Sequence, residues 1–198
     1  MQADHPLGNR EIADLFDTIA DMLQLKGESI HRVMAYRRAA ESIRELPRDL
    51  RAVMSEGKLK DIEGIGDVLA AKIHELLETG QLEFYNELKA EIPPGLVDML
   101  RVNGVGPKKA MLFYRQLGIS SLQQLEAAAR EGKLSGLSGM GSKSEKKILE
   151  GIEALARQSQ RVRIDVALTL ARLILNRLRE VPGVVRSDIG GSIRRGRA

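Results

Sequence analysis

The sequence predicts a mainly helical protein, and three observations lead to this expectation. Apolar residues recur at helical spacing along most of the chain. One short figure occurs three times: an apolar residue, then Gly-apolar-Gly, then an amphipathic run; the copies begin at Ile62, Val102 and Leu137. Glycine and proline pairs divide the helical runs into two units, followed by a third, shorter region.

The first unit is expected to hold four helices, over residues 9–24, 31–45, 49–56 and 67–78. Asn9 is expected to cap the first of them, because a short polar side chain at this position accepts hydrogen bonds from free amides. Lys26-Gly27 and Thr79-Gly80 carry the glycine that ends helices. The second helix should stop before Pro47, since a residue that precedes proline disfavours helical backbone.

The second unit is expected to hold helices over residues 81–90, 96–101, 108–117 and 144–158, with another helix capped by Ser121. Pro93-Pro94-Gly95 is expected to form a firm boundary between the helices over residues 81–90 and 96–101.

The third region begins after Arg161. Ile164–Arg179 keeps helical spacing, and Pro182-Gly183 ends it. Residues 184–189 are strand-like, with β-branched residues in partial alternation. Because a single strand is not stable alone, it pairs either with another chain or within a larger domain that is cut short here. We favour the second possibility.

Each two-glycine turn stands directly before a predicted helix: Gly64 and Gly66, Gly104 and Gly106, Gly139 and Gly141. Glycine tolerates positive φ and lets another backbone approach closely. The helix start behind it offers unpaired N–H groups and the positive end of the helix dipole. These groups together suit phosphate oxygens. The repetition therefore points to a nucleic-acid backbone as the ligand.

Composition narrows the function classes. The 198 residues include no cysteine and three histidines, which excludes disulfides and makes a zinc site improbable. No apolar run approaches the roughly 20 residues of a membrane helix, and the N-terminus lacks a signal-peptide pattern. We expect a monomeric cytoplasmic protein without a membrane partner. Its net charge is +4, and the positive excess lies after residue 156 as arginine, which suits phosphate contacts. Aromatic residues, at 3%, are too few for a stacking single-strand binder.

Four motifs resemble the N-terminal part of the family X DNA polymerases, the group that includes DNA polymerase beta and the bacterial PolX repair enzymes. They are AYRRAA from Ala35, IEGIGDVLAAKI from Ile62, VNGVGPKKA from Val102 and GSIRRG from Gly191. The resemblance covers essentially the whole chain. It implies two helical helix-hairpin-helix domains followed by the first helix and strand of a truncated α/β palm.

The resemblance also implies domain boundaries and a role in gap-filling DNA repair. Residues 1–90 correspond to the lyase-type domain that grips the 5′ end of a gapped strand. Residues 91–160 correspond to the DNA-binding fingers, and residues 161–198 to the start of the palm, a nucleotidyltransferase domain. The expected partner is gapped or nicked duplex DNA.

Lys72 stands where the family has its lyase lysine, whose neutral amine attacks the C1′ aldehyde of a 5′-deoxyribose phosphate. Such a lysine needs a lowered pKa, from nearby positive charge or from desolvation. Arg32 and Lys60 match basic family positions. Val68 and Ala71 depart from the family, which has a lysine and an acid there. An ordinary solvated or phosphate-contacting lysine is the alternative for Lys72.

The DNA-binding residues implied by the resemblance are His31, Arg32, Tyr36, Lys60, Gly64, Gly66, Gly104, Gly106, Lys108 and Lys109. Backbone carbonyls in the first two turns are expected to bind Na⁺ or K⁺ beside a phosphate: those of Lys60, Ile62, Ile65, Leu100, Val102 and Val105. In the third turn a purely structural role is favoured, although Lys143, Lys146 and Lys147 lie nearby.

Gly191, Ser192 and Arg195 match family residues that hold the triphosphate of an incoming deoxynucleotide. The family uses two Mg²⁺ held by carboxylates beyond this motif. Because only Arg197 and Ala198 follow Gly196, this polypeptide is expected not to polymerise DNA by itself, whereas the full-length enzyme would.

Two further functions are compatible with parts of the sequence. A non-enzymatic tandem helix-hairpin-helix scaffold would bind DNA without lyase chemistry. A helical protein-interaction adaptor would account for the amphipathic helices, but it does not explain why a glycine pair precedes each helix. Lys72 and the GSIRRG segment favour the polymerase.

Overall fold

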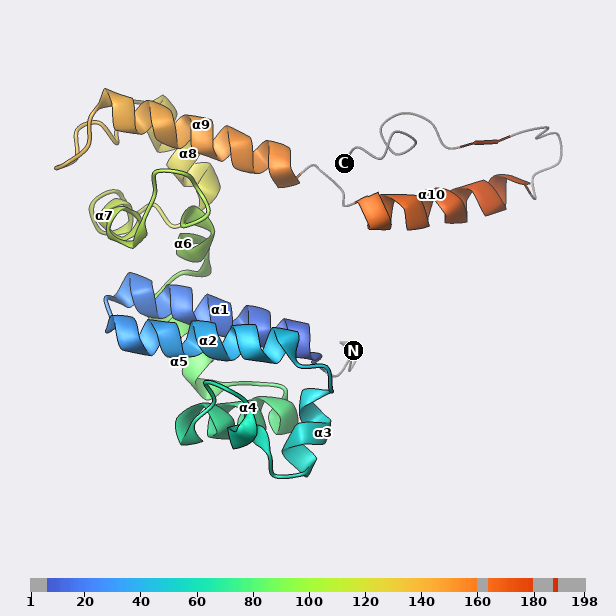
Figure 1. Cartoon of the computed structure of the whole chain (residues 1–198). Coiled ribbons are helices and arrows are strands. Elements are labelled where there is room, and N and C mark those ends of the chain that lie inside the picture. The colour runs from blue at the N-terminus through green and yellow to red at the C-terminus, as the bar shows by residue number, and fades with distance from the viewer. Residues whose placement is uncertain (1–6, 160–163, 180–186, 189–198) are drawn as a thin grey trace. The chain divides into compact units, whose positions relative to one another are not determined.

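The computed structural model of the chain describes residues 7–159, 164–179 and 187–188 (Figure 1). The predicted mainly helical fold is confirmed, and no strand occurs among these residues. The chain divides into two compact units that differ from the units expected from the sequence. From here on, the first unit is residues 1–149 and the second unit is residues 150–198. The helices are α1 (Asn9–Lys26), α2 (Ile30–Glu45), α3 (Leu50–Ser55), the 3-10 helix η1 (Leu59–Asp61), α4 (Asp67–Thr79), α5 (Glu83–Glu91), α6 (Pro94–Met99), α7 (Pro107–Leu117), α8 (Leu122–Arg130), α9 (Ser142–Ser159) and α10 (Ile164–Arg179).

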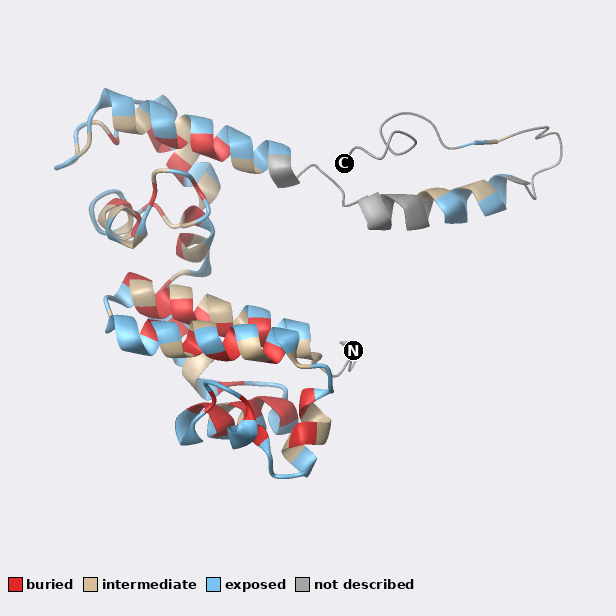
Figure 2. Ribbon diagram, viewed as in Figure 1, coloured by how far each residue is buried: buried red, intermediate tan, exposed pale blue. Residues whose placement is uncertain are grey.

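Helices α1 and α2 form an antiparallel pair whose buried residues line the facing sides (Figure 2). Ile12, Phe16 and Ile19 of α1 are fully buried, at the i, i+4, i+7 spacing that the sequence shows. Gly27 ends α1 in the left-handed conformation, at φ 85°, as predicted. This pair supplies several of the largest fully buried side chains, Phe16, Ile19 and Ile43 among them.

The start of α1 differs from the prediction. Gly8 is the N-cap, and its amide donates to Oε2 of Glu11 at 2.8 Å. Asn9 is the first helical residue, and its side chain bridges to the start of α3 instead. Its Oδ1 accepts from the amide of Leu50 at 2.8 Å, and its Nδ2 donates to the carbonyl of Arg48 at 2.7 Å. Asn9 therefore fastens α3 to α1, a long-range role that local spacing does not reveal.

Pro93-Pro94-Gly95 was expected to precede a helix that begins at residue 96, but α6 begins two residues earlier, at Pro94. Pro93 caps α6 and Pro94 occupies its first turn, where a missing N–H costs nothing. Gly95 lies inside α6. A Cβ at this position would stand 2.1 Å from the carbonyl oxygen of Ser120, so a larger residue does not fit there. The glycine is needed for close packing of α6 against the segment before α8.

Gly95→Ala is expected to destabilise the protein by about 3 kcal/mol, because the obstructing atom is backbone and cannot rotate away. The thermal or urea midpoint would show this loss. Gly136→Ala is the matched control, since its Cβ would meet nothing closer than 3.9 Å. We expect the control to stay within about 0.5 kcal/mol of the parent. Equal midpoints for the two variants would contradict the packing argument.

Helix α1 contacts α2 and also α5, α6 and α7, so it links the helices before residue 80 to those after it. Ser121 caps α8, as predicted, by accepting from the amide of Gln124 at 3.2 Å. The second unit contains α10, whose Leu173, Ile174 and Leu178 are exposed. The strand expected at residues 184–189 lies outside the described residues except for Ser187 and Asp188, which are in neither helix nor strand. None of the described helices combines the length and apolar character of a membrane span.

Candidate nucleic-acid interface

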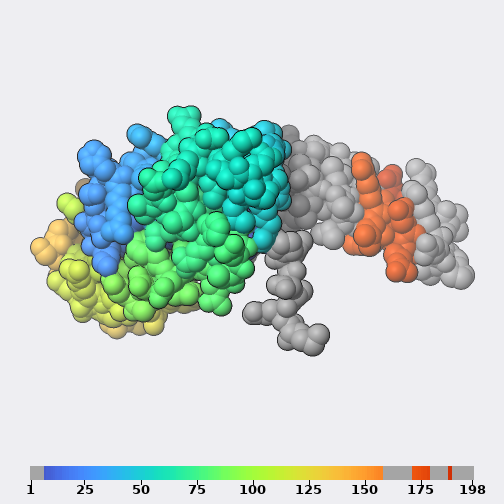
Figure 3. All heavy atoms as spheres, turned by 90° about the horizontal axis from the view of Figure 1, so that it is seen from below, coloured from blue at the N-terminus to red at the C-terminus, as the bar shows by residue number. Residues whose placement is uncertain are grey.

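The three glycine turns share one backbone hydrogen-bond pattern. In the first turn the amide of Ile65 donates to the carbonyl of Ile62 at 3.1 Å, and in the second Val105 donates to Val102 at 3.0 Å. In the third turn the donor is Met140 and the acceptor Leu137, at 3.0 Å. The repeated sequence figure therefore corresponds to a repeated structure. The first turn and α4 lie on the face of the first unit that Figure 3 shows.

The first glycine of each turn is left-handed: φ is 78° at Gly64, 95° at Gly104 and 74° at Gly139. This conformation requires glycine. The second glycine is different, since Gly66 and Gly106 are extended backbone that any residue can adopt. A Cβ at either position would meet no protein atom within 4 Å. The fold gives no packing reason for these two glycines, whereas a ligand that approaches the backbone does.

Helices α4 and α7 begin directly behind Gly66 and Gly106, and neither has a side-chain cap. Their first-turn amides are consequently free to donate outward. In α7 the first helical residue is Pro107, so the available donors begin at Lys108. Each turn thus presents open glycine backbone, free amides and the positive end of a helix dipole at one place.

The apolar residues of the third turn are less buried than those of the first two turns. Ile62, Ile65, Val102 and Val105 are buried in the first two turns, whereas Leu137 and Met140 are only half-buried. Oε2 of Glu145, in the first turn of α9, accepts from the amides of Leu134 and Ser135 at 3.0 Å each. The negative charge of this carboxylate opposes the binding of a phosphate at the third turn. The structural role expected for this turn fits these contacts.

Lysine side chains surround the first two turns, but two of them have protein partners. Nζ of Lys60 forms an ion pair with Asp67, the first residue of α4. Nζ of Lys109 donates to the carbonyl of Gly104 at 3.0 Å, so it braces the second turn from within. Lys108 is exposed, and Lys147 of α9 extends its side chain to within 3.6 Å of where a Cβ of Gly104 would stand. Lys147 is therefore nearer to the second turn than its sequence position indicates.

The six carbonyls expected to hold a monovalent cation belong to two equivalent backbone segments. Those of Ile62 and Val102 each accept one backbone hydrogen bond. Among the described residues, the carbonyls of Lys60, Ile65, Leu100 and Val105 accept none from the backbone outside the helices. Free carbonyl oxygens are ligands suited to hard cations. The binding of Na⁺ or K⁺ at these two turns is compatible with this chemistry and stays a prediction.

Lys72 lies in an aromatic and basic cluster formed by α2, α4 and α5. Its Nζ lies 4.0 Å from the ring centroid of Phe84, and Cζ of Arg32 lies 5.2 Å from the same centroid. The ring of Tyr36 stacks behind Phe84 at 6.1 Å, and Phe16 packs against Tyr36 at 5.5 Å. Two cations therefore converge on one half-buried ring that is supported from the core.

Burial is the main cause that lowers the pKa of Lys72. Arg32 lowers it further by charge repulsion, whereas Glu75 and Glu87 raise it. Burial also raises the pKa of Tyr36 to about 12, although Arg32 acts in the opposite direction. The phenol is thus neutral at ordinary pH. With 3% of its surface exposed, Tyr36 supports the pocket from behind.

The remaining predicted residues are distributed as follows. His31 and Arg32 are exposed on α2, and Arg32 is itself part of the cluster around Lys72. Val68 is 69% exposed at the start of α4, where the family resemblance leads one to expect a lysine. Gly191, Ser192 and Arg195 lie outside the described residues. Sequence reasoning missed Phe84, although Phe84-Tyr85 is an adjacent pair in a chain with only three Phe and three Tyr.

Comparisons with known proteins agree with this arrangement. Residues 7–82 match the family described as "Helix-hairpin-helix domain", and residues 96–154 match "SAM-like Helix-hairpin-helix tandem". The first span contains the turn at Gly64, and the second contains those at Gly104 and Gly139. The predicted helix-hairpin-helix organisation is confirmed.

The curated proteins that are similar to this chain include the following two polymerases. Over 188 residues, 95% of the chain, it is 34% identical to "DNA polymerase/3'-5' exonuclease PolX" of Bacillus subtilis (strain 168), of which it covers 32%. Over 119 residues, 60% of the chain, it is 27% identical to "DNA polymerase lambda" of Arabidopsis thaliana, of which it covers 22%. The chain thus spans about a third or less of the length of these relatives.

Proposed function

Since this chain is homologous to the family X DNA polymerases over nearly its whole length, we propose that it is the DNA-binding portion of such a polymerase and holds gapped DNA by its sugar-phosphate backbone. One observation carries the proposal: Gly66 and Gly106 stand open, without packing neighbours, at helix starts with free amides. Contacts of this kind position a protein on DNA without reading sequence. Binding should therefore be indifferent to sequence and sensitive to salt.

We place the domain boundaries as the resemblance implies. Residues 1–90 would grip the downstream 5′ end, residues 91–160 would hold the other side of the gap, and residues 161–198 would begin the palm. Gly191, Ser192 and Arg195 would then contact the triphosphate of a deoxynucleotide. The divalent metal that polymerisation needs calls for carboxylate ligands, and the described residues contain no cluster of acids or histidines that could hold one. Because the chain covers 32% of the PolX relative, we propose polymerisation for the full-length protein, as a monomer in the cytoplasm.

For the cluster around Lys72 we propose 5′-deoxyribose-phosphate lyase chemistry. The neutral amine attacks the C1′ aldehyde, and loss of water gives an imine. A proton then passes from C2′ to water, its electron pair moves into the imine, and the C3′–O bond breaks, so that the DNA strand departs with the oxygen as a 5′-phosphate. Arg32 would hold the 5′-phosphate, and the lowered pKa of Lys72 would supply the neutral amine.

The DNA-binding proposal is tested by a salt titration on two matched duplexes, one intact and one with a single-nucleotide gap bearing a 5′-phosphate. We expect tighter binding to the gapped duplex, and an affinity that falls linearly on a log–log plot against salt. Removing the 5′-phosphate should reduce the preference. Equal binding to both duplexes would instead favour a non-enzymatic tandem helix-hairpin-helix scaffold, and salt-independent binding would contradict backbone contact altogether.

A further inference from the structure

The first two glycine turns differ in charge. They lie in the equivalent segments 60–68 and 100–108 and share one backbone hydrogen-bond pattern. The first segment has a net charge of −2, because it holds one lysine and three acids: Lys60, Asp61, Glu63 and Asp67. The second has a net charge of +2, because it holds Arg101 and Lys108 and no acid. The two turns therefore offer a phosphate the same backbone in opposite charge environments.

Asp67 is the acid that stands directly at the start of α4. It is the first helical residue after Gly66, and its carboxylate forms an ion pair with Nζ of Lys60. The hydrogen bond from Lys60, and then its charge, lower the pKa of Asp67 below the usual range. The carboxylate is consequently ionised at neutral pH, at the place where the first turn would receive a phosphate.

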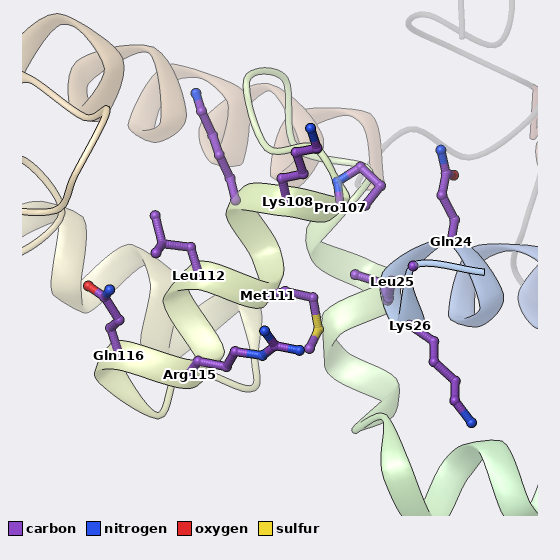
Figure 4. A pocket seen from close by; sticks show the side chains of 12 residues that line it. Gln24, Leu25, Lys26, Pro107, Lys108, Met111, Leu112, Arg115 and Gln116 are labelled. Carbon is purple, nitrogen blue, oxygen red and sulfur yellow. The ribbon is translucent and has the colours of Figure 1, made fainter. Parts of the chain in front are cut away.

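The second turn has no carboxylate at this place. Pro107 occupies the position equivalent to Asp67, and Lys108 lies beside it at the start of α7 (Figure 4). The groove between the end of α1 and α7 reaches this turn, and no acid from the described part of the chain lines it. A phosphate at the second turn therefore meets free amides and positive charge without an intramolecular competitor.

At the first turn, a carboxylate and a phosphate would need the same partners, the ammonium of Lys60 and the positive end of α4. The side chains of Asp67 and Lys60 are 82% and 65% exposed, so water screens their ion pair and a phosphate can replace the carboxylate. We infer that Asp67 competes with DNA phosphate at the start of α4, so that the first turn holds DNA more weakly than the second. The inference rests on the proposed function, since it ranks the two phosphate sites of that function.

The first test is Asp67→Asn, which keeps the shape of the side chain and removes its charge. The whole chain should bind a gapped duplex with a 5′-phosphate about threefold more tightly. The salt slope should grow in magnitude by about 0.9, because Lys60 is released to neutralise one phosphate. The melting midpoint should not rise, since α4 loses a favourable charge at its start. A purely structural role for Asp67 does not predict tighter binding by a less stable protein.

Glu126→Gln is the control for the change in net charge. It removes a carboxylate from another ion pair, which Glu126 forms with Arg130 of α8 at 2.6 Å, outside both turns. Its affinity for the same duplex should stay within about 1.5-fold of the parent, because salt screens distant charges.

The second test alters the second turn in the opposite direction. Pro107→Asp places a carboxylate at the position equivalent to Asp67 and should weaken binding about fivefold. An acid is favourable at a helix start, so folding should be maintained. The ranking of the turns is measured with single glycine variants. Gly106→Ser should weaken binding more than Gly66→Ser, although a Cβ at either position meets no protein atom within 4 Å.

Unchanged or weaker binding by Asp67→Asn, an equal gain by Glu126→Gln, or unchanged binding by Pro107→Asp would overturn the inference. So would a loss from Gly66→Ser as large as that from Gly106→Ser. If the parent keeps its preference for gapped over intact DNA in any of these cases, the proposed function stands and only the competition by Asp67 is wrong. If the parent shows no such preference, the proposed function has failed and takes the inference with it.

Discussion

Lys72→Ala is expected to abolish covalent trapping of the chain on DNA with a 5′-deoxyribose phosphate when borohydride reduces the imine. The amine of Lys72 is half-buried against Phe84, and this burial lowers its pKa. A fraction of the molecules therefore carries a neutral Lys72 amine at a pH where an ordinary lysine is almost fully protonated. Arg32, the second cation at Phe84, carries a guanidinium that stays protonated and does not act as a nucleophile. Among the residues that the structure describes, no amine other than that of Lys72 lies over the Phe84 ring.

Lys89→Ala is a matched control, because Nζ of Lys89 also lies over an aromatic ring, 4.6 Å from the centroid of Tyr85. Both variants lose one cation–π contact, worth about 0.5–1 kcal/mol at an exposed site. They should therefore be similarly stable, and only Lys72→Ala should lose the adduct. An adduct that persists without Lys72 would mean that this lysine merely contacts phosphate or solvent.

The pH dependence follows from the same contacts. Trapping needs the neutral amine, so its rate should rise with pH through the pKa of Lys72, and a lowered pKa moves this rise to lower pH. Glu75 raises the pKa, while its Oε1 accepts from the amide of Glu83 at 2.7 Å. Glu75→Gln keeps an acceptor for that amide and removes the charge. The midpoint of the rate profile should therefore shift to lower pH; an upward shift would contradict the assignment.

Much of the helical fold follows from local spacing. The helix at 164–179 begins and ends where the sequence predicts, and Gly27 and Gly80 end their helices in the left-handed conformation. The errors have tertiary causes. Asn9 reads locally as a helix cap, but its side chain instead bonds to the backbone of Arg48 and Leu50 at the start of α3.

In the candidate site, too, the local features could be predicted from the sequence and the tertiary contacts could not. The turns were predictable because the glycine pattern is local and repeated. The position of Phe84 beside Lys72 was not, because it brings α4 and α5 together through a contact that no spacing rule encodes. Lys109 was expected to contact DNA, and in the structure its Nζ donates to the carbonyl of Gly104 in its own turn, so contact with DNA stays a prediction. A long side chain near a free carbonyl has this intramolecular option, and sequence does not decide between the two.

Replacing both open glycines, as Gly66→Ser with Gly106→Ser, should lower the affinity for gapped DNA at least about tenfold. Both residues are extended N-caps with nothing within 4 Å of a Cβ, and serine is a better N-cap than glycine. Folding should therefore be unharmed or slightly stabilised. The hydroxymethyl groups would occupy the space of phosphate oxygens and accept from the same amides. Because one phosphate would be displaced at each turn, the salt slope should fall in magnitude by about 1.8.

Gly8→Ser is the matched control for this double variant. Gly8 is also an extended N-cap, at φ −85° and ψ 168°, and Glu11 already accepts from its amide. Serine there completes a capping box and should stabilise α1 without changing DNA affinity. Because all three substitutions improve a cap, only the location distinguishes them. Unchanged DNA binding by the double variant would show that the turns serve folding alone, and the phosphate-binding role would have to be abandoned.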